Sequence, residues 1–377
     1  MRAGDVAEFL IKITKHCNLR CSYCNEFAEL GYTERMPLAR IRRIFENIAA
    51  YAALDASQAI TFTWHGGEPF LVPLSYYDAI AELQHEIFNG IPVVNGVQTN
   101  LTILTERHLE YLASNRFFTR LGVSFDPYGD QRVDLKGRLR TDQILNNIQR
   151  LIDHDIDFGA LTVLARNTVA HARHIYHFFD RLGVSCKFVP FYLSSFSQQI
   201  VDHAIERNEI VHALSEVFDA WSSSVTATLV APIDDYLESA LAYITGRNDR
   251  RYDRGAHEYS VIVNLDGGVW APNDTYFEKY RYGNLLDQDL QQILASPARA
   301  LVVDEARRRQ ETYCGRCRYF GACPGIYVAD ASPQQQELLA TSGCPVQGVI
   351  DHMIEVLDRS KIPELDRDPA PVVENFG

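Results

Sequence analysis

The sequence predicts an α/β fold in which six parallel strands form an open or partial barrel. Two observations lead to this prediction. Short apolar runs alternate with amphipathic helical stretches over residues 8–191, and the glycine-rich and cysteine-rich motifs directly follow two of these runs. Strand–helix alternation repeated this often favours right-handed crossovers, and such sheets carry their chemistry at the carboxyl ends of the strands.

Each element of this repeat has its own pattern. The expected strands are apolar runs rich in β-branched and aromatic residues, at 9–14, 59–64, 92–99, 120–125, 158–165 and 186–192. The expected helices show apolar residues at helical spacing, at 38–53, 76–88, 105–114, 141–154 and 172–183. Their alternation defines the first predicted domain, residues 1–200.

The remainder of the chain has a different pattern. Residues 201–256 are expected to form a helical linker, which ends in a charged, glycine-containing stretch at 247–258. Two β-rich runs joined by Leu-Asp-Gly-Gly then predict a hairpin over 259–271. This hairpin opens a predicted second domain, residues 257–350. Residues 351–377 are expected to form a helix end and a mobile, proline-rich tail.

Composition and charge exclude several function classes. The chain has 377 residues, of which 46% are hydrophobic and 11% aromatic, so it can bury a sizeable core and is not expected to be disordered. The 36 basic and 49 acidic residues give a net charge of −13, which disfavours general nucleic-acid binding. No apolar run reaches membrane-spanning length, and no signal-peptide pattern opens the chain. We therefore expect a cytoplasmic protein.

The cysteines fall into two groups and one isolated residue. In a cytosolic chain of this size, clustered cysteines are more often metal ligands or catalysts than disulfides. Cys186 stands alone on an apolar run and is expected to be a buried small hydrophobe. The grouped cysteines are Cys17, Cys21 and Cys24 near the start, and Cys314, Cys317, Cys323 and Cys344 near the end.

The first group has the spacing C-x3-C-x2-C and directly follows the first predicted strand. Three thiolates can bind three corners of a cubane iron–sulfur cluster and leave one iron open to a ligand. Spacing alone also allows zinc or chance clustering. The next strand ends in His-Gly-Gly-Glu-Pro at residues 65–69, where two glycines permit a close backbone approach to a ligand.

These residues resemble the radical S-adenosylmethionine (SAM) enzymes. The resemblance rests on C-x3-C-x2-C with Tyr23, on Gly-Gly-Glu-Pro, on VQTNLT at 97–102 and on GVSFDP at 122–127. It implies that the three cysteines hold a 4Fe–4S cluster whose open iron chelates SAM. Reductive cleavage of SAM would then give a 5′-deoxyadenosyl radical that abstracts a hydrogen atom from the substrate.

The resemblance also implies a set of SAM contacts. Gly66, Gly67 and Glu68 would contact the amino group, and one of two arginines would pair with the carboxylate. The sequence has Asp-Pro where relatives often have Asp-Gly-Pro, so either arginine could instead be a surface charge. Val163 and Leu164 are the candidates for the adenine site, although apolar strand residues of this kind are also common in the core. The further candidates are Ser124, Arg132, Arg138, Val163 and Leu164.

The second cysteine group has the spacing C-x2-C-x5-C with a fourth cysteine further on. Four thiolates suffice for a closed zinc site or a fully ligated cubane. Residues 257–350 resemble the SPASM extension of radical SAM enzymes that modify peptides and proteins. Three expected SPASM cysteines are missing, with Asn273 and Tyr327 at two of those positions and none near His257. We therefore predict one auxiliary 4Fe–4S cluster, and two clusters in all.

Asp274 follows one of these vacated positions. In sulfatase-maturing relatives an aspartate there is the proposed catalytic base, although a turn role is an alternative. The resemblance implies a peptide maturase that forms an oxidised crosslink, a C–C cyclophane or a thioether, with net loss of two hydrogens. The alternatives are an anaerobic sulfatase maturase that makes formylglycine from Ser or Cys, and a non-catalytic zinc or iron–sulfur scaffold or sensor.

The implied partners are a ribosomally made precursor peptide and a flavodoxin or ferredoxin-type electron donor. We expect no nucleic-acid or membrane partner, and the sequence leaves the oligomeric state open. No segment before residue 8 is expected to bind a leader, so the precursor should dock on the barrel, on the SPASM domain or on a partner protein.

Overall fold

The computed structural model describes residues 6–53, 59–191, 203–226, 228–272 and 276–357. Its centre is one ten-stranded sheet with the order β10-β9-β8-β1-β2-β3-β4-β5-β6-β7. The strands are β1 Glu8–Thr14, β2 Ile60–Gly66, β3 Val93–Thr99, β4 Arg120–Ser124, β5 Gly159–Leu164, β6 Cys186–Pro190, β7 Val230–Ala231, β8 Ser260–Val263, β9 Gly268–Trp270 and β10 Gly283–Asn284.

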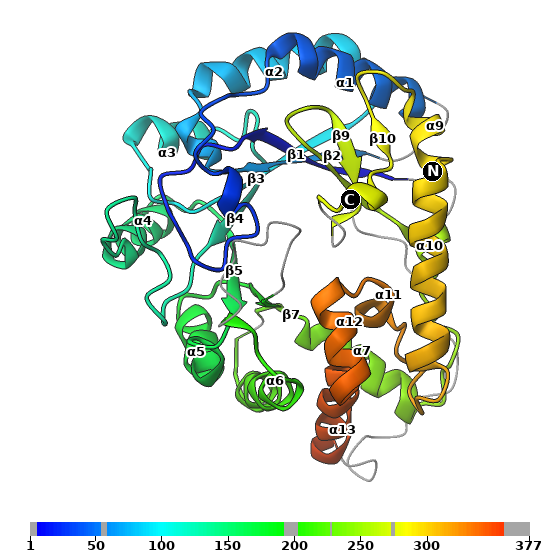
Figure 1. The fold of residues 1–377 in the computed structure, drawn as a ribbon. Helices are drawn as coiled ribbons and strands as arrows, with labels where there is room; N and C mark the ends of the chain where they lie inside the picture. The colour runs from blue at the N-terminus through cyan, green and yellow to red at the C-terminus, as the bar shows by residue number, and fades with distance from the viewer. Residues whose placement is uncertain (1–5, 54–58, 192–202, 227, 273–275, 358–377) are drawn as a thin grey trace.

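Strands β1 to β6 are neighbours in chain order and pair in parallel, so a helix must return the chain between each pair. In Figure 1 these helices form an arc outside the sheet, from α1 and α2 round to α5. This arrangement confirms the predicted α/β class. The crossover helices are α1 Leu38–Ala52, α2 Leu74–Ile87, α3 Glu106–Ala113, α4 Thr141–Asp153 and α5 Ala172–Arg181.

The core lies between the sheet and this arc of helices. Phe45 of α1 packs its ring 4.9 Å from that of Phe62 on β2, and Trp64 on the same strand is fully buried. On α4, Ile144, Ile148 and Leu151 recur at helical spacing and are all buried. Side chains at period two on the strands therefore meet side chains at period 3.6 on the helices, as the sequence pattern predicts.

The C-terminal part continues the same sheet. Strand β8 pairs in parallel with β1, with Phe9 opposite Val261, and β9 and β10 add antiparallel strands. The predicted hairpin corresponds to β8 and β9. The other helices are α6 Arg207–Ser222, α7 Ile233–Ile244, α8 Arg254–His257, α9 Leu290–Leu294, α10 Pro297–Arg309, α11 Ile326–Ala329, α12 Pro333–Ser342 and α13 Pro345–Leu357.

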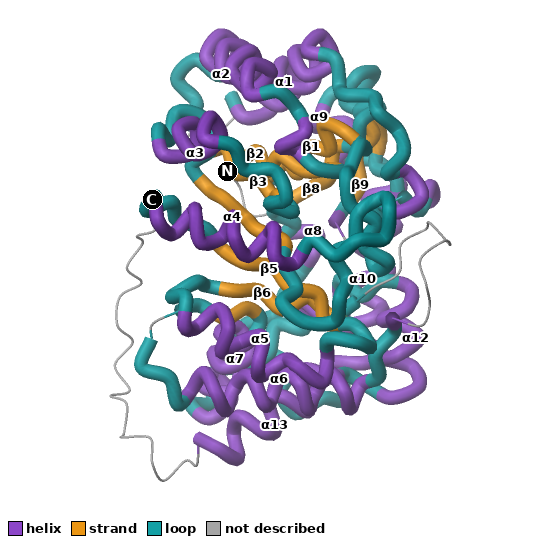
Figure 2. Tube along the Cα trace, turned by 90° about the vertical axis from the view of Figure 1, so that its left-hand side faces the viewer, coloured by secondary structure: helices purple, strands orange, loops and turns teal. Residues whose placement is uncertain are grey.

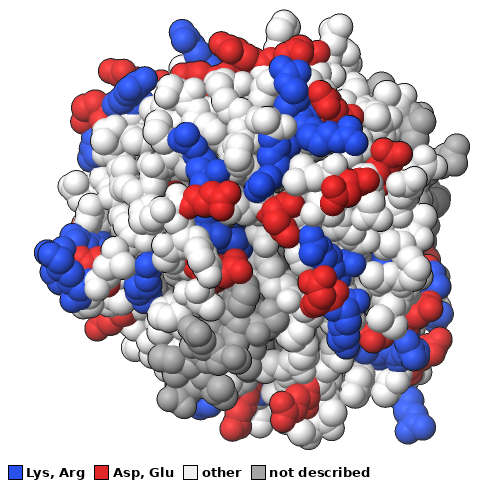
Figure 3. All heavy atoms as spheres, turned by 45° about the horizontal axis from the view of Figure 1, so that its top comes forward, with Lys and Arg blue, Asp and Glu red and all other residues white. Residues whose placement is uncertain are grey.

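Helices α6 and α7 pack against α13, and Figures 1 and 2 show all three at the same end of the molecule. Residues from the predicted helical linker thus lie beside the last helix. On the face in Figure 3, basic and acidic side chains are interspersed, with no broad area of one sign. Among the described residues, no helix is both long and apolar enough to cross a membrane.

Candidate active site

The three N-terminal cysteines lie in a loop that begins where β1 ends. Cys17 and Cys21 are buried and Cys24 is half-buried, and all three line one cavity of about 270 Å³. The ends of β2, β3, β4, β5 and β6 contribute the opposite walls of this cavity. The parallel topology therefore gathers side chains from six strands at one edge of the sheet, as expected for this architecture.

Two glycines allow β2 to approach the cysteine loop. Gly66 has φ +131°, and a Cβ atom there would collide with the carbonyl oxygen of Thr14. A Cβ at Gly67 would collide with the carbonyl of His16. In return, the Gly67 amide donates to the Thr14 carbonyl at 2.8 Å, and the next amide, of Glu68, donates to His16 at 2.8 Å. The two glycines are therefore required for this local packing.

Hydrogen-bond donors surround the cysteine sulfurs. The Leu19 amide donates to the Cys17 Sγ atom at 3.4 Å, and the Asn100 side-chain amide donates to it at 3.6 Å. Burial, with a smaller contribution from neighbouring Cys21, raises the pKa of Cys17 and of Cys24 to about 12 in the absence of metal. Donors to sulfur stabilise thiolates and tune iron–sulfur clusters, so the loop fits three-thiolate ligation of a cluster.

One of the two candidate arginines lies in the cavity. The Arg132 side chain is 6% exposed, and its Nε atom lies 2.8 Å from the Oδ2 atom of Asp126. Its Nη1 atom lies 4.0 Å from the Cys21 sulfur, and the Tyr23 hydroxyl donates to Asp126. Burial opposes ionisation, but Asp126 raises the pKa of Arg132 above its ordinary value. Arg132 is thus a fixed cation at the cavity wall.

The other arginine lies elsewhere. The Arg138 side chain is 61% exposed and pairs with Asp134 at 2.8 Å on a surface turn. Among the remaining predicted SAM contacts, Ser124 and Val163 line the cavity, and the Ser124 hydroxyl accepts a hydrogen bond from Gln98 at 2.7 Å. Leu164 is fully buried and is not one of the cavity-lining residues.

Glu68 is fully buried behind the cavity wall. Its carboxylate accepts hydrogen bonds from the Thr99 hydroxyl at 2.6 Å, the Asn100 amide at 2.7 Å and the Phe70 amide at 2.9 Å. Burial raises the pKa of Glu68 despite these donors. The side chain therefore joins the ends of β2 and β3, and Asn100, which donates to Cys17, is positioned by this contact.

The polar end of the cavity contains three further side chains, Lys12, Glu26 and His65. Lys12 and Glu26 are 3% and 1% exposed, and the Lys12 ammonium lies 3.0 Å from the Glu26 carboxylate. The sequence pattern gave none of these residues a role of its own, although His65 opens the His-Gly-Gly-Glu-Pro motif. The available signal was the lysine inside FLIKIT, because a charge within a buried strand is rarely left there without a partner.

The C-terminal cysteines gather around helices α7, α11 and α13. Cys314 ends a π-helical turn at Gln310–Cys314, and burial together with Cys344, Cys323 and Cys317 raises its pKa to about 12. The amides of Val346 and Gln347, at the start of α13, donate to the sulfur of Cys344. The four thiols therefore lie near one another.

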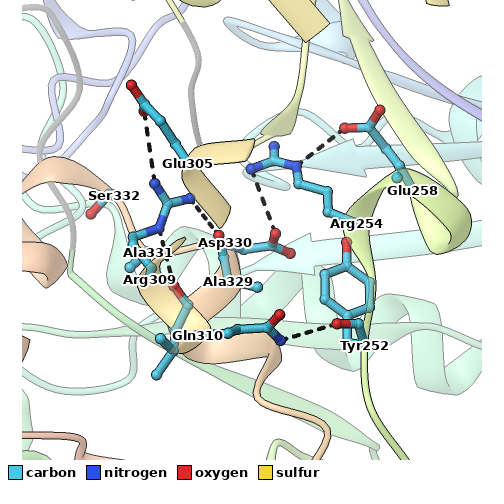
Figure 4. Close-up of polar contacts among 12 residues, drawn as sticks. Tyr252, Arg254, Glu258, Glu305, Arg309, Gln310, Ala329, Asp330, Ala331 and Ser332 are labelled. Atoms are coloured by element: carbon cyan, nitrogen blue, oxygen red, sulfur yellow. Dashed lines mark hydrogen bonds and ion pairs between the residues drawn. The ribbon is translucent and has the colours of Figure 1, made fainter. Parts of the chain in front are cut away.

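A polar network lies around Arg309 and Gln310, in the segment that leads to Cys314, and Figure 4 shows its contacts. The side-chain amide of Gln310 donates to the carbonyls of Tyr252 at 3.1 Å and Pro324 at 3.3 Å. The guanidinium of Arg309 donates to the carbonyls of Val328, at 3.2 Å, and Ala329. These contacts hold the chain segments on both sides of the loop that carries Cys314 and Cys323.

Within the described part of the chain, no three His, Cys, Asp or Glu side chains come as close together as a single metal ion would require. Asp274, the predicted base, lies outside the described residues, as does Asn273.

Comparison with known proteins agrees with this geometry. Residues 11–179 match the model of the radical SAM superfamily. The chain is 25% identical over 334 residues to a serine-type anaerobic sulfatase-maturating enzyme of Bacteroides thetaiotaomicron, covering 82% of this chain and 79% of that protein. It is 25% identical over 320 residues to a cysteine-type enzyme of Clostridium novyi, covering 82% and 84%.

Solved structures show the same fold. Native anSMEcpe with bound AdoMet and peptide superposes with a TM-score of 0.72 at 19% identity, covering 93% of this chain and 96% of that one. Streptococcus suis SuiB bound to S-adenosylmethionine gives a TM-score of 0.62 at 12% identity, covering 91% and 76%. Residues 11–179 therefore form a radical SAM domain, and the chain is homologous to the anaerobic sulfatase-maturating enzymes and shares the fold of anSMEcpe over most of its length.

Proposed function

We propose that this enzyme uses SAM to oxidise a residue of a peptide or protein by two electrons. One observation supports the proposal most strongly. A single cavity brings together the thiols of Cys17, Cys21 and Cys24, the Gly66–Gly67 backbone and the cation of Arg132 at the carboxyl ends of six strands. The curated relatives and solved structures that act on or bind peptides extend over most of the chain.

When bound, SAM and the reduced 4Fe–4S cluster supply a radical that takes a hydrogen atom from an unactivated carbon. The chain's own residues position and shield this chemistry. Cys17, Cys21 and Cys24 would hold the cluster, and Arg132 would pair with the carboxylate of SAM. Val163 would contact the adenine. Cys17, Cys21 and Arg132 are buried, which limits the access of water to the reacting atoms.

The second cysteine group would hold a closed auxiliary 4Fe–4S cluster. The other three thiols lie close enough to Cys314 to raise its pKa, and two backbone amides of α13 donate to the sulfur of Cys344. A fully ligated cluster has no open iron, so its role is electron acceptance or structural support. A flavodoxin or ferredoxin-type protein would supply the electron that reduces the first cluster.

Two products are consistent with this oxidation. The first candidate is an intramolecular crosslink of the cyclophane or thioether type, favoured because the C-terminal group retains four cysteines rather than the seven of a full SPASM domain. The second is formylglycine, favoured by similarity to serine-type and cysteine-type sulfatase-maturating enzymes. Both products would form in the same cavity.

The first experiment measures iron and SAM cleavage after anaerobic reconstitution. Wild-type enzyme should bind about eight irons, and the triple Cys17/Cys21/Cys24→Ala variant about four. Only the wild type should release 5′-deoxyadenosine when a reductant is added. Equal iron in both proteins, or no cleavage by a fully loaded wild type, would refute the proposal.

The second experiment separates the two products. Loaded enzyme is incubated with synthetic peptides rich in aromatic residues and with peptides that contain serine or cysteine. A peptide that loses two hydrogens and does not react with an aminooxy probe indicates a crosslink. A peptide that becomes reactive toward the probe carries an aldehyde, which indicates formylglycine. A neighbouring gene for a short peptide would supply a natural substrate to test.

A further inference from the structure

The cavity has a polar end whose side chains are not among the predicted SAM contacts. Lys12 on β1, Glu26 after the cysteine loop and His65 at the end of β2 line this end together. The residues that flank them on the wall, Leu10 and Ile262, are apolar. Charged side chains buried in such surroundings need oppositely charged or hydrogen-bonding partners. The position of Lys12 in turn determines which tautomer His65 adopts.

The charges at this end are paired. Glu26 accepts from Lys12 at 3.0 Å, pairs with Lys15 and accepts a hydrogen bond from the Tyr276 hydroxyl. Lys15 also pairs with Glu29 at 2.8 Å. Burial acts against ionisation of Glu26, but Lys12 and Lys15 hold its pKa well below the ordinary value. Lys12 is therefore held in place by Glu26, beside the imidazole of His65.

The two contacts of His65 specify its tautomer. Its Nδ1 atom lies 3.2 Å from the Lys12 ammonium and 2.7 Å from the amide nitrogen of Gly66. Both neighbours are donors with no lone pair to offer, so Nδ1 must be the unprotonated acceptor. Burial and then Lys12 lower the pKa of His65 to about 3, so the ring is neutral. A neutral ring with a bare Nδ1 atom carries its proton on Nε2.

The Nε2 atom is thus a hydrogen-bond donor on a half-buried ring in the cavity wall. Among the described residues, no hydrogen bond or ion pair engages it. A fixed neutral donor at this point suits an acceptor-only group. The backbone carbonyl oxygen is such a group, and every peptide substrate contains it.

We propose that His65, held in the Nε2–H tautomer by Lys12, positions the substrate by donating a hydrogen bond to a carbonyl oxygen of the peptide residue that is oxidised. This inference rests on the proposed function, and it names the residue that orients the substrate relative to SAM. Orientation of this kind is a major contribution to catalysis, because a misplaced carbon cannot meet the radical.

The test uses reconstituted holoenzyme and a peptide that the wild type converts in the product assay above. His65→Leu keeps the volume and removes the donor, whereas His65→Gln keeps a neutral N–H donor. We expect His65→Leu to raise the KM for peptide by about tenfold or more, because the carbonyl loses its donor on binding. His65→Gln should recover most of this loss, and the dissociation constant for SAM should stay near the wild-type value in both variants.

Lys12→Met provides a second, independent variant, since it removes the ammonium that keeps Nδ1 bare. We expect a KM between those of the wild type and His65→Leu. The matched control is His85→Leu, an exposed histidine on α2, which should behave as the wild type. An unchanged KM in His65→Leu would overturn the inference. Weakened SAM binding or reduced iron would also overturn it, by assigning His65 to the cofactor.

Failure of the inference is distinguishable from failure of the proposed function. If the loaded wild type cleaves SAM but oxidises none of the peptides, the proposed function fails, and the inference fails with it. If the wild type oxidises a peptide and His65→Gln is as impaired as His65→Leu, the donor role fails and the proposed function stands. Recovery in His65→Gln alone supports both.

Discussion

The two cysteine groups share one ligand chemistry but differ in their surroundings. Three thiols at the N-terminal site face a cavity with Arg132 on one wall and Lys12 and His65 at its polar end. Four thiols at the C-terminal site lie close to one another among helices, and none of them is among the residues that line this cavity. The site with three thiols therefore opens onto space for a ligand, whereas the site with four thiols does not line this cavity.

The hydrogen-bond donors to sulfur come from different elements at the two sites. At the first site, the side chains of Asn100 and Arg132 and the backbone amide of Leu19 reach the sulfurs. At the second site, backbone amides at the start of α13 and the side chain of Ser239 on α7 do so. Asn100 follows β3 and Arg132 follows β4, so the first site depends on the parallel topology that brings these strand ends together. The first site therefore faces a cavity at the strand ends, whereas helices surround the second.

The largest expected effect separates the two sites directly. Cys17→Ala should abolish SAM cleavage and remove about four irons, because an open cluster cannot persist on two thiolates. Cys314→Ala should also remove about four irons, yet keep SAM cleavage within about tenfold of wild type, since distant sites behave nearly independently. Iron analysis and 5′-deoxyadenosine release measure both. Equal loss of cleavage in the two variants would contradict the comparison.

The next effect concerns the two candidate arginines. Arg132→Ala leaves the buried carboxylate of Asp126 without its cation, so we expect a loss of about 3–5 kcal/mol in unfolding free energy and weaker SAM binding. Arg138→Ala, at an exposed turn, should leave the unfolding midpoint and SAM binding near the wild-type values. Denaturant titration and isothermal calorimetry with SAM decide the matter. Normal SAM affinity in Arg132→Ala would refute its assigned role.

A smaller effect tests the close approach of β2 to the cysteine loop. Gly67→Ala places a Cβ against the carbonyl of His16, and we expect a loss of about 1–3 kcal/mol with reduced iron at the first site. Gly31→Ala is the matched control, because no atom lies within 4 Å of the added Cβ. Iron at the C-terminal site should stay constant in both. Thermal unfolding and iron analysis measure both variants. If Gly67→Ala and Gly31→Ala behaved alike, the close approach at Gly67 would not matter for the first site.

The smallest expected effect is a pH dependence found only at the first site. The pKa of His65 falls from about 6.5 in the unfolded chain to about 3 in the fold. Its contribution to stability is complete above pH 6.5 and decreases as the pH falls toward 3, because the unfolded state binds the extra proton. His65→Gln should therefore flatten the decline in unfolding free energy of the metal-free protein between pH 7 and 5. An unchanged slope, measured against His85→Gln, would argue against the neutral imidazole.

Much of the fold followed from local pattern. The predicted strands and helices over residues 8–191 correspond to β1–β6 and α1–α5, since period-two and period-3.6 patterns are written in the sequence itself. The hairpin over 259–271 was also predicted. Its pairing with β1 was not, because registry between Phe9 and Val261 joins segments some 250 residues apart, and no local signal carries such contacts.

The site was predictable in part. Spacing and residue type drew attention to the cysteines and the glycine pair, and the resemblance to radical SAM enzymes supplied their expected roles. Spacing could not choose between Arg132 and Arg138, which both follow β4, because the choice depends on which side chain turns inward toward Asp126. The polar end around Lys12, Glu26 and Tyr276 was missed because its members come from three distant segments.

By itself, then, the sequence determined the α/β class, the two cysteine groups and the strand ends at which the cavity lies. Residue type and short-range periodicity suffice for these, because they arise from contacts between near neighbours. Only the tertiary structure decided which arginine enters the cavity, that Glu68 supports the wall from behind, and which nitrogen of His65 carries the proton. Each of these depends on burial and on partners that the fold alone brings within hydrogen-bond distance.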